Sequence, residues 1–221
     1  VDSPGGSGLR QMDPALQEVE ARKAARLAVL MLLLPRLLAL GVAYLIYTQG
    51  DRESYDAQIA FFTGLAGTHW GYIYTAAVVF SFLTSWLNTA PLIQKARVTR
   101  DSLRANMYVL KVSSPDRGRR PPYVVLEDDG PQGEYNRANR SLHNFVEWAA
   151  ALALIIALAG VIFPFPVLVL TATLALSRMW HQCSYAGRNG SQAVGLAVAI
   201  ACSAVLEMLA LVIALRALKA L

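Results

Sequence analysis

The chain has 221 residues, of which 55% are hydrophobic, and its mean hydropathy is +0.40. This composition is too apolar for an ordinary soluble domain, and several apolar runs approach the roughly 20 residues that cross a bilayer. The net charge is +5, but the basic residues lie beside the apolar runs, which argues against nucleic acid as a partner. We therefore predict an all-α, polytopic membrane helix bundle. Cys183 and Cys202 have no metal-ligand or redox spacing, so no metal site is expected.

Residues 1–70 are predicted to form an N-terminal extension with one extra hydrophobic helix. The first span is expected at Leu27–Tyr47. Pro35 should kink this helix, and Arg36 needs a protein partner or a path to the membrane surface. Because of these two residues, the segment could instead lie partly in the membrane interface as an anchor. The apolar stretch Ile59–Trp70 is expected to be interfacial or to begin the next helix.

Residues 71–221 are predicted to form a four-helix transmembrane domain. Four spans are expected in it: Tyr72–Ile93, Tyr135–Ile162, Val167–Tyr185 and Ala193–Leu215. A polar insertion at residues 98–133 separates the first two of these spans, and we expect a surface loop there. Short turns join the other helices, so helices that follow one another should be antiparallel neighbours.

The placement of the basic residues predicts the orientation of these five spans. If the N-terminus, residues 94–140 and the turn at 186–192 share one side, that side holds most of the twenty Lys and Arg residues. By the positive-inside rule it faces the cytosol, the mitochondrial matrix or the plastid stroma. We therefore expect an integral protein of the endoplasmic reticulum or of an organellar membrane.

Two polar stripes lie near the basic side. One span carries four polar residues at the spacing of a single helical face: Arg137, Arg140, Asn144 and Glu147. The next span carries three more: Arg178, His181 and Tyr185. Polar groups are costly in lipid, so the stripes should face one another, a neighbouring subunit or a polar ligand. Such a cluster suits an anionic, peptide-like ligand, with Arg178 as the natural partner of Glu147. The alternative is a purely structural network between helices.

The run Tyr135–Glu147 resembles the signature of the MAPEG family, the membrane-associated proteins of eicosanoid and glutathione metabolism. That signature is aromatic-Asn-x-x-x-Arg-Ala-x-x-Asn-x-x-Glu, and Ser141 replaces its alanine here. The later Arg178-x-x-His181-x-x-x-Tyr185 and the earlier Lys95-Ala96-Arg97 are also similar to the family. The resemblance covers about residues 71–215 and is closest to the type-three microsomal glutathione transferase branch.

The resemblance implies a homotrimer with glutathione bound between adjacent subunits. It assigns seven residues to the glutathione site: Arg137, Arg140, Asn144, Glu147, Arg178, His181 and Tyr185. Family members conjugate glutathione to lipophilic electrophiles or reduce lipid hydroperoxides. In the family, an arginine near the start of the last helix stabilises the glutathione thiolate, which is the nucleophile.

The chain departs from this pattern where the last helix begins, because it has no arginine in Gln192–Gly195. Arg188, earlier in the turn, and Tyr185 are the remaining candidates for a catalytic role. Two functions therefore stay open. The first is a glutathione-dependent transferase or peroxidase. The second is a non-catalytic subunit of a larger respiratory or photosynthetic membrane complex, which would dock through the extra helix and the polar insertion.

Overall fold

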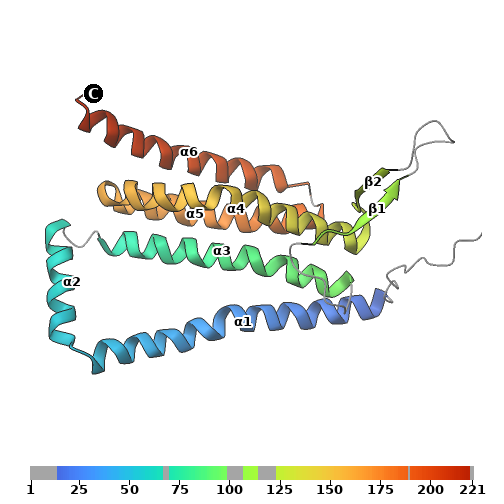
Figure 1. Cartoon of the computed structure of the whole chain (residues 1–221), viewed down its shortest axis with the longest axis horizontal. Helices are drawn as coiled ribbons and strands as arrows, with labels where there is room; N and C mark the ends of the chain where they lie inside the picture. Colours follow the sequence, from blue (N-terminus) through green and yellow to red (C-terminus); the bar gives the residue numbers. More distant parts are fainter. Residues whose placement is uncertain (1–13, 67–69, 99–106, 114–122, 189, 220–221) are drawn as a thin grey trace, which may run out of the picture.

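The computed structural model describes residues 14–66, 70–98, 107–113, 123–188 and 190–219 (Figure 1). This part of the chain forms six helices and one two-stranded sheet, and the predicted all-α class is confirmed. The elements in chain order are α1 Pro14–Gln49, α2 Arg52–Ala66, α3 Trp70–Val98, β1 Leu110–Ser113, β2 Tyr123–Leu126, α4 Gly130–Ile162, α5 Pro164–Gly187 and α6 Gln192–Ala217.

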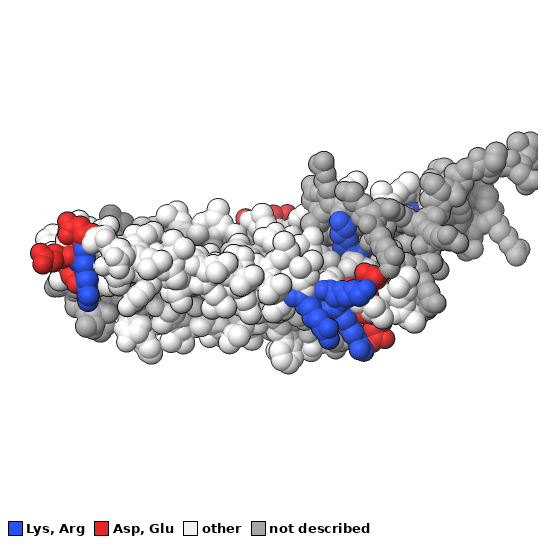
Figure 2. All heavy atoms as spheres, turned by 90° about the horizontal axis from the view of Figure 1, so that it is seen from below, with Lys and Arg blue, Asp and Glu red and all other residues white. Residues whose placement is uncertain are grey.

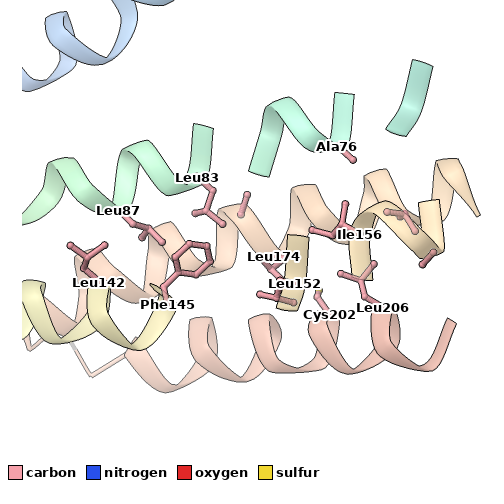
Figure 3. Close-up of a cluster of buried hydrophobic side chains, with 13 residues drawn as sticks. Ala76, Leu83, Leu87, Leu142, Phe145, Leu152, Ile156, Leu174, Cys202 and Leu206 are labelled. Carbon is pink, nitrogen blue, oxygen red and sulfur yellow. The ribbon is translucent and has the colours of Figure 1, made fainter. Parts of the chain in front are cut away.

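Helices α3, α4, α5 and α6 pack as a bundle in which successive helices are antiparallel (Figure 1). Large apolar side chains from all four helices fill its interior (Figure 3), among them Leu83, Leu87, Phe145, Leu174 and Leu206. Only Phe163 separates α4 from α5, and a proline follows it at the start of α5. This one-residue connection keeps α4 and α5 side by side.

The outer surface of the helices is apolar, as a bilayer requires. In Figure 2 the charged side chains lie mainly toward the two ends of the molecule, with a long uncharged stretch between them. An exposed apolar surface of this extent is unfavourable in water but matches lipid. Four described segments are long and apolar enough to cross a membrane: Glu18–Gln49, Trp70–Val98, Gly130–Ile162 and Gln192–Leu215. The chain is therefore an integral membrane protein.

Helix α5, predicted as a further span, is not among these four segments. Its 24 residues are long enough, but Arg178, His181 and Gln182 lower its hydropathy. All three side chains are buried, and α5 runs beside α4 (Figure 1). The polar groups of α5 therefore face the interior of the bundle, where polar residues at membrane depth are expected.

The N-terminal extension differs from its prediction in detail. Helix α1 is continuous from Pro14 to Gln49, so Pro35 does not end it. The Arg36 side chain donates to the Leu32 carbonyl one turn earlier (2.6 Å) and to Ser85 Oγ of α3 (2.6 Å). Its guanidinium also lies over the ring of Phe82, 5.5 Å from the centroid. The predicted protein partner of Arg36 is thus α3, and this contact helps to hold α1 on the bundle.

Helix α2 contains most of the stretch Ile59–Trp70, which we expected to be interfacial or to begin the next helix. It begins at Arg52 and lies across the ends of α1 and α3 (Figure 1). Its first turns carry charges, and apolar residues such as Ile59 and Phe61 follow. A helix that runs across the ends of membrane-spanning helices, with mixed polar and apolar residues, is typical of the membrane interface.

The polar insertion is not the plain surface loop that we predicted. Strands β1 and β2 pair antiparallel, with Leu110 opposite Leu126 and Val112 opposite Val124. Alternating apolar residues and β-branched side chains explain why these short segments form strands. The rest of the insertion before β1 and between the strands, residues 99–106 and 114–122, lies outside the described residues.

Candidate functional site

Three buried side chains at the start of α4 hold the segment that precedes β1. Asn136 accepts a hydrogen bond from the Val109 amide (2.9 Å) and donates to the Val109 carbonyl (2.7 Å). Tyr135 and Asn139 both donate to the Met107 carbonyl, at 2.8 and 3.0 Å. Residue 108, which lies between the two clamped residues, is therefore fixed against α4.

Tyr108 is the residue that this clamp positions. Its hydroxyl lies 2.7 Å from Nδ1 of His143, and the two rings meet edge to face at 5.6 Å. Burial raises the pKa of Tyr108, although the charge of Arg140 acts in the opposite direction. The hydroxyl is therefore protonated at neutral pH and able to donate a hydrogen bond. The role of Tyr108 could not be predicted from the sequence, because only the fold brings this segment next to α4.

Arg140 and Glu147 lie on the outside of α4. Both are exposed, and neither forms a hydrogen bond or ion pair with any residue that the structure describes. His143 and Asn144, which are half-buried, lie between them on the same side of the helix. We call these four residues the α4 outer face. It presents one free cation, one free carboxylate and two groups that form hydrogen bonds.

Arg137 belongs to the same predicted stripe but points into the protein. Its guanidinium donates to the carbonyls of Tyr185 (3.1 Å) and Ala186 (2.9 and 3.1 Å) at the end of α5. It also donates to the backbone carbonyl of Asp128 (2.6 Å) and forms an ion pair with its carboxylate (3.2 Å). A cation that meets the unpaired carbonyls of a helix C-terminus is favourable. Arg137 thus ties α5 to α4.

Arg188, the predicted catalytic candidate in the turn, is engaged by the same acidic run. It ends α5 in the left-handed region, at φ 54°. Its guanidinium forms ion pairs with Asp128 and with Asp129, the latter at 3.3 Å. Desolvation raises the pKa of Asp128, but the hydrogen bond from Arg137 and the charge of Arg188 outweigh this and hold the pKa below its ordinary value. Both arginines are therefore neutralised by protein carboxylates.

Arg178 faces the interior of the bundle. It donates to Asn144 Oδ1 (3.1 Å) and to the Ser141 carbonyl (3.3 Å), and it lies over the Phe145 ring at 5.4 Å. The predicted ion pair between Arg178 and Glu147 is wrong. Asn144, half-buried at the edge of the α4 outer face, accepts the hydrogen bond from Arg178, and Glu147 is exposed.

His181 and Tyr185 form the other end of the α5 stripe. Their rings stack with centroids 5.5 Å apart and an interplanar angle of 13°. Nδ1 of His181 donates to the Gln192 carbonyl (2.9 Å) at the start of α6. His181 therefore links α5 to α6, at the place where the family has its arginine by resemblance. Val194 in that turn is 65% exposed and supplies no charge.

Among the described residues, the two predicted stripes meet inside one chain through the hydrogen bond from Arg137 to the Tyr185 carbonyl and through the contact between Arg178 and Asn144. The space beside these two residues is about 10 Å³, smaller than a single water molecule usually needs. Ligand pockets usually measure about 300 Å³ or more. A tripeptide therefore does not fit between α4, α5 and α6 of one chain. On this stretch of α4, the outer face is the surface where free polar groups remain for a ligand.

Comparison with known proteins agrees with this architecture. No curated protein and no solved structure matches the chain significantly. The sequence model of the MAPEG family matches residues 73–214, which include α4, α5 and almost all of α3 and α6. Helices α1 and α2 precede the matched region. Because the match covers well over half of the sequence, the chain belongs to the MAPEG family.

Proposed function

We propose that the protein binds glutathione on the α4 outer face and uses it to modify lipophilic electrophiles or to reduce lipid hydroperoxides. MAPEG proteins generally use glutathione, which supports this class of activity. The observation that carries the proposal is Arg140. It is exposed, has no carboxylate partner among the described residues, and shares its face with Glu147. An unpaired guanidinium is suited to bind a carboxylate through two hydrogen bonds.

The chain also offers a way to stabilise the thiolate without the arginine of the last helix. When His143 donates from Nδ1 to the Tyr108 oxygen, the Tyr108 hydroxyl is free to donate to the glutathione sulfur. The thiol proton then passes to water, the sulfur bonds to the electrophilic carbon, and the leaving group departs with its electron pair. The positive charge of Arg140 favours the thiolate as well. Asn144, whose oxygen accepts from Arg178, retains its amide N–H groups for the ligand.

The α4 outer face is open on one side, so a second wall is needed to enclose a tripeptide. MAPEG proteins are typically homotrimeric, and we infer that a second copy of the chain supplies this wall. By its motifs, the type-three microsomal glutathione transferase branch is the best fit. We infer that the α4 outer face lies on the cytosolic, matrix or stromal side, in the endoplasmic reticulum or in an organellar membrane.

The test is glutathione binding to the detergent-solubilised protein, measured by titration calorimetry. Arg140→Ala is expected to raise the dissociation constant about 10- to 100-fold, the effect of losing a charged hydrogen-bond partner. Arg22→Ala is the matched control, because Arg22 is 73% exposed and lies on α1. The proposal fails if both variants bind glutathione as the unmodified protein does.

A second function, a non-catalytic subunit of a larger membrane complex, is favoured by different observations. Arg188 is held by acidic residues, and the start of α6 has no cation. The β1–β2 hairpin also exposes an apolar face, with Val112 69% and Val124 61% accessible. Such a face outside the membrane suits contact with another subunit. Under this alternative, the protein co-purifies with a large complex in mild detergent, and migration as a free homotrimer contradicts it.

A further inference from the structure

A large open pocket, which we call the cavity, lies where α1 and α3 meet α2, and it shares no residue with the α4 outer face. Figure 1 shows α1 and α3 diverging toward α2, which connects them. Residues of these three helices line a space of about 640 Å³ that is open on one side. Its walls are mainly apolar and include Ala43, Ile46 and Gly71. Apart from Tyr74, all the lining residues precede the region that matches the family.

The apolar part of this cavity favours an apolar ligand over water. The cavity is open to the surroundings of the helices, and lining side chains such as Ile46 and Tyr74 are exposed to them. Water at membrane depth needs polar partners, and the part of the wall formed by Ala43, Ile46 and Gly71 offers none from its side chains. The cavity opens between two helices whose outer surfaces are apolar, so its natural content in a bilayer is a lipid chain.

The polar groups of the cavity add a second feature. The side chains of Gln58, Tyr55 and Tyr74 line it, and none forms a hydrogen bond with a residue that the structure describes. The indole nitrogen of Trp70, whose ring also lines the cavity, is covered and has no acceptor. Amide, hydroxyl and indole groups can all donate hydrogen bonds, so this end of the cavity is suited to a ligand rich in oxygen acceptors.

The basic side chain of Arg52 lies at the edge of the cavity. The Arg52 guanidinium lies 5.5 Å from the centroid of the Tyr47 ring, which lines the cavity. Arg52 also forms an ion pair with Asp56 (3.6 Å), but both side chains are exposed, and exposed ion pairs are weak. Tyr47 also donates a hydrogen bond to Asp56, which keeps its ring at the edge of α2. Aromatic residues with polar tips beside a basic residue are typical of the level of the lipid headgroups.

We infer that this cavity binds one glycerophospholipid. An acyl chain lies between α1 and α3, the ester oxygens accept hydrogen bonds from Gln58 and the tyrosines, and the phosphate lies beside Arg52. The bound lipid fills the gap between the N-terminal helices and α3. The inference does not depend on the proposed glutathione site, because no residue of α4 lines the cavity.

Native mass spectrometry of the full-length protein, purified in mild detergent and titrated with dioleoyl phosphatidylglycerol, tests this inference. Gly71→Leu fills the cavity, whereas Gly41→Leu is the same change on α1 outside it. A side chain at either glycine meets no atom within 4 Å at its Cβ. We expect about one tightly bound phospholipid per chain in the unmodified protein and in Gly41→Leu, and little in Gly71→Leu. Gln58→Met, which keeps the length of the side chain, should weaken binding about fivefold.

Equal lipid retention in Gly71→Leu and Gly41→Leu would overturn the inference. So would unchanged affinity in Gln58→Met, a variant that leaves the cavity walls in place if Gly71→Leu fails to fold. A polypeptide that co-purifies in place of the phospholipid, and is lost in Gly71→Leu, would show instead that the cavity receives a segment of another membrane protein.

Discussion

Arg137 and Arg140 are three residues apart and yet have different surroundings. Arg137 is buried and donates to three backbone carbonyls and one carboxylate. Arg140 is exposed and has no such partner among the described residues. Residues three positions apart differ by about 60° around a helix, which is enough to place one inside the bundle and the other on its surface. The first has a structural role, and the second is available to a ligand.

This difference predicts opposite effects of the same substitution. Arg137→Ala leaves the carbonyls at the end of α5 without their donor, so we expect a loss of about 1 to 3 kcal/mol of stability, the cost of an unsatisfied buried acceptor. Arg140→Ala should change stability by no more than about 0.5 kcal/mol. Unfolding of the two variants in detergent, followed by circular dichroism, measures this. Equal stability of the two would contradict the assigned roles.

At the level of elements, the contact between α5 and α6 depends on Gly195. A Cβ at this position would lie 2.9 Å from the His181 amide nitrogen, 2.9 Å from the Ser177 carbonyl oxygen and 3.1 Å from the Trp180 ring. Two of these atoms belong to the backbone of α5, so a change of side-chain rotamer cannot relieve the clash. Small residues allow such close approach of membrane helices. The close approach of the two helices also brings His181 within hydrogen-bond distance of the Gln192 carbonyl.

We therefore expect Gly195→Ala to destabilise the protein by about 1 to 3 kcal/mol, the usual effect of overpacking. Gly71→Ala is the control, because its Cβ meets nothing within 4 Å and alanine favours a helix. Thermal unfolding in detergent should show a lower midpoint for the first variant and an unchanged or higher midpoint for the second. A midpoint for Gly195→Ala at or above that of the unmodified protein would exclude tight packing at this site.

Periodicity revealed much of the architecture but not the contacts between distant segments. Apolar runs predicted the helices, because membrane spans need long uninterrupted apolar stretches. They did not predict the hairpin, since its strands of four residues lie among polar residues. Tyr108 could not be found from sequence, because its position depends on hydrogen bonds to Asn136 and Asn139 of α4. Nor could spacing alone show that Asn144, and not Glu147, faces Arg178.

At the level of the whole molecule, the described helices carry two separate features. The α4 outer face, within residues 140–147, lies about midway along α4, and the cavity that we infer to bind a phospholipid lies beside α2 (Figure 1). The family match covers the first feature, whereas almost all of the second precedes it. In our inference, the N-terminal helices thus add a lipid-binding site to the bundle. In our proposal, the polar groups of the bundle itself bind glutathione.

The central claim is that the assembled protein holds glutathione at the α4 outer face. Native mass spectrometry of the purified protein, with and without millimolar glutathione, tests it most directly. We predict a homotrimer that gains the mass of glutathione, and a loss of this gain in Arg140→Ala while the trimer persists. A protein that never gains this mass, or that exists only within an assembly of other subunits, would contradict the account.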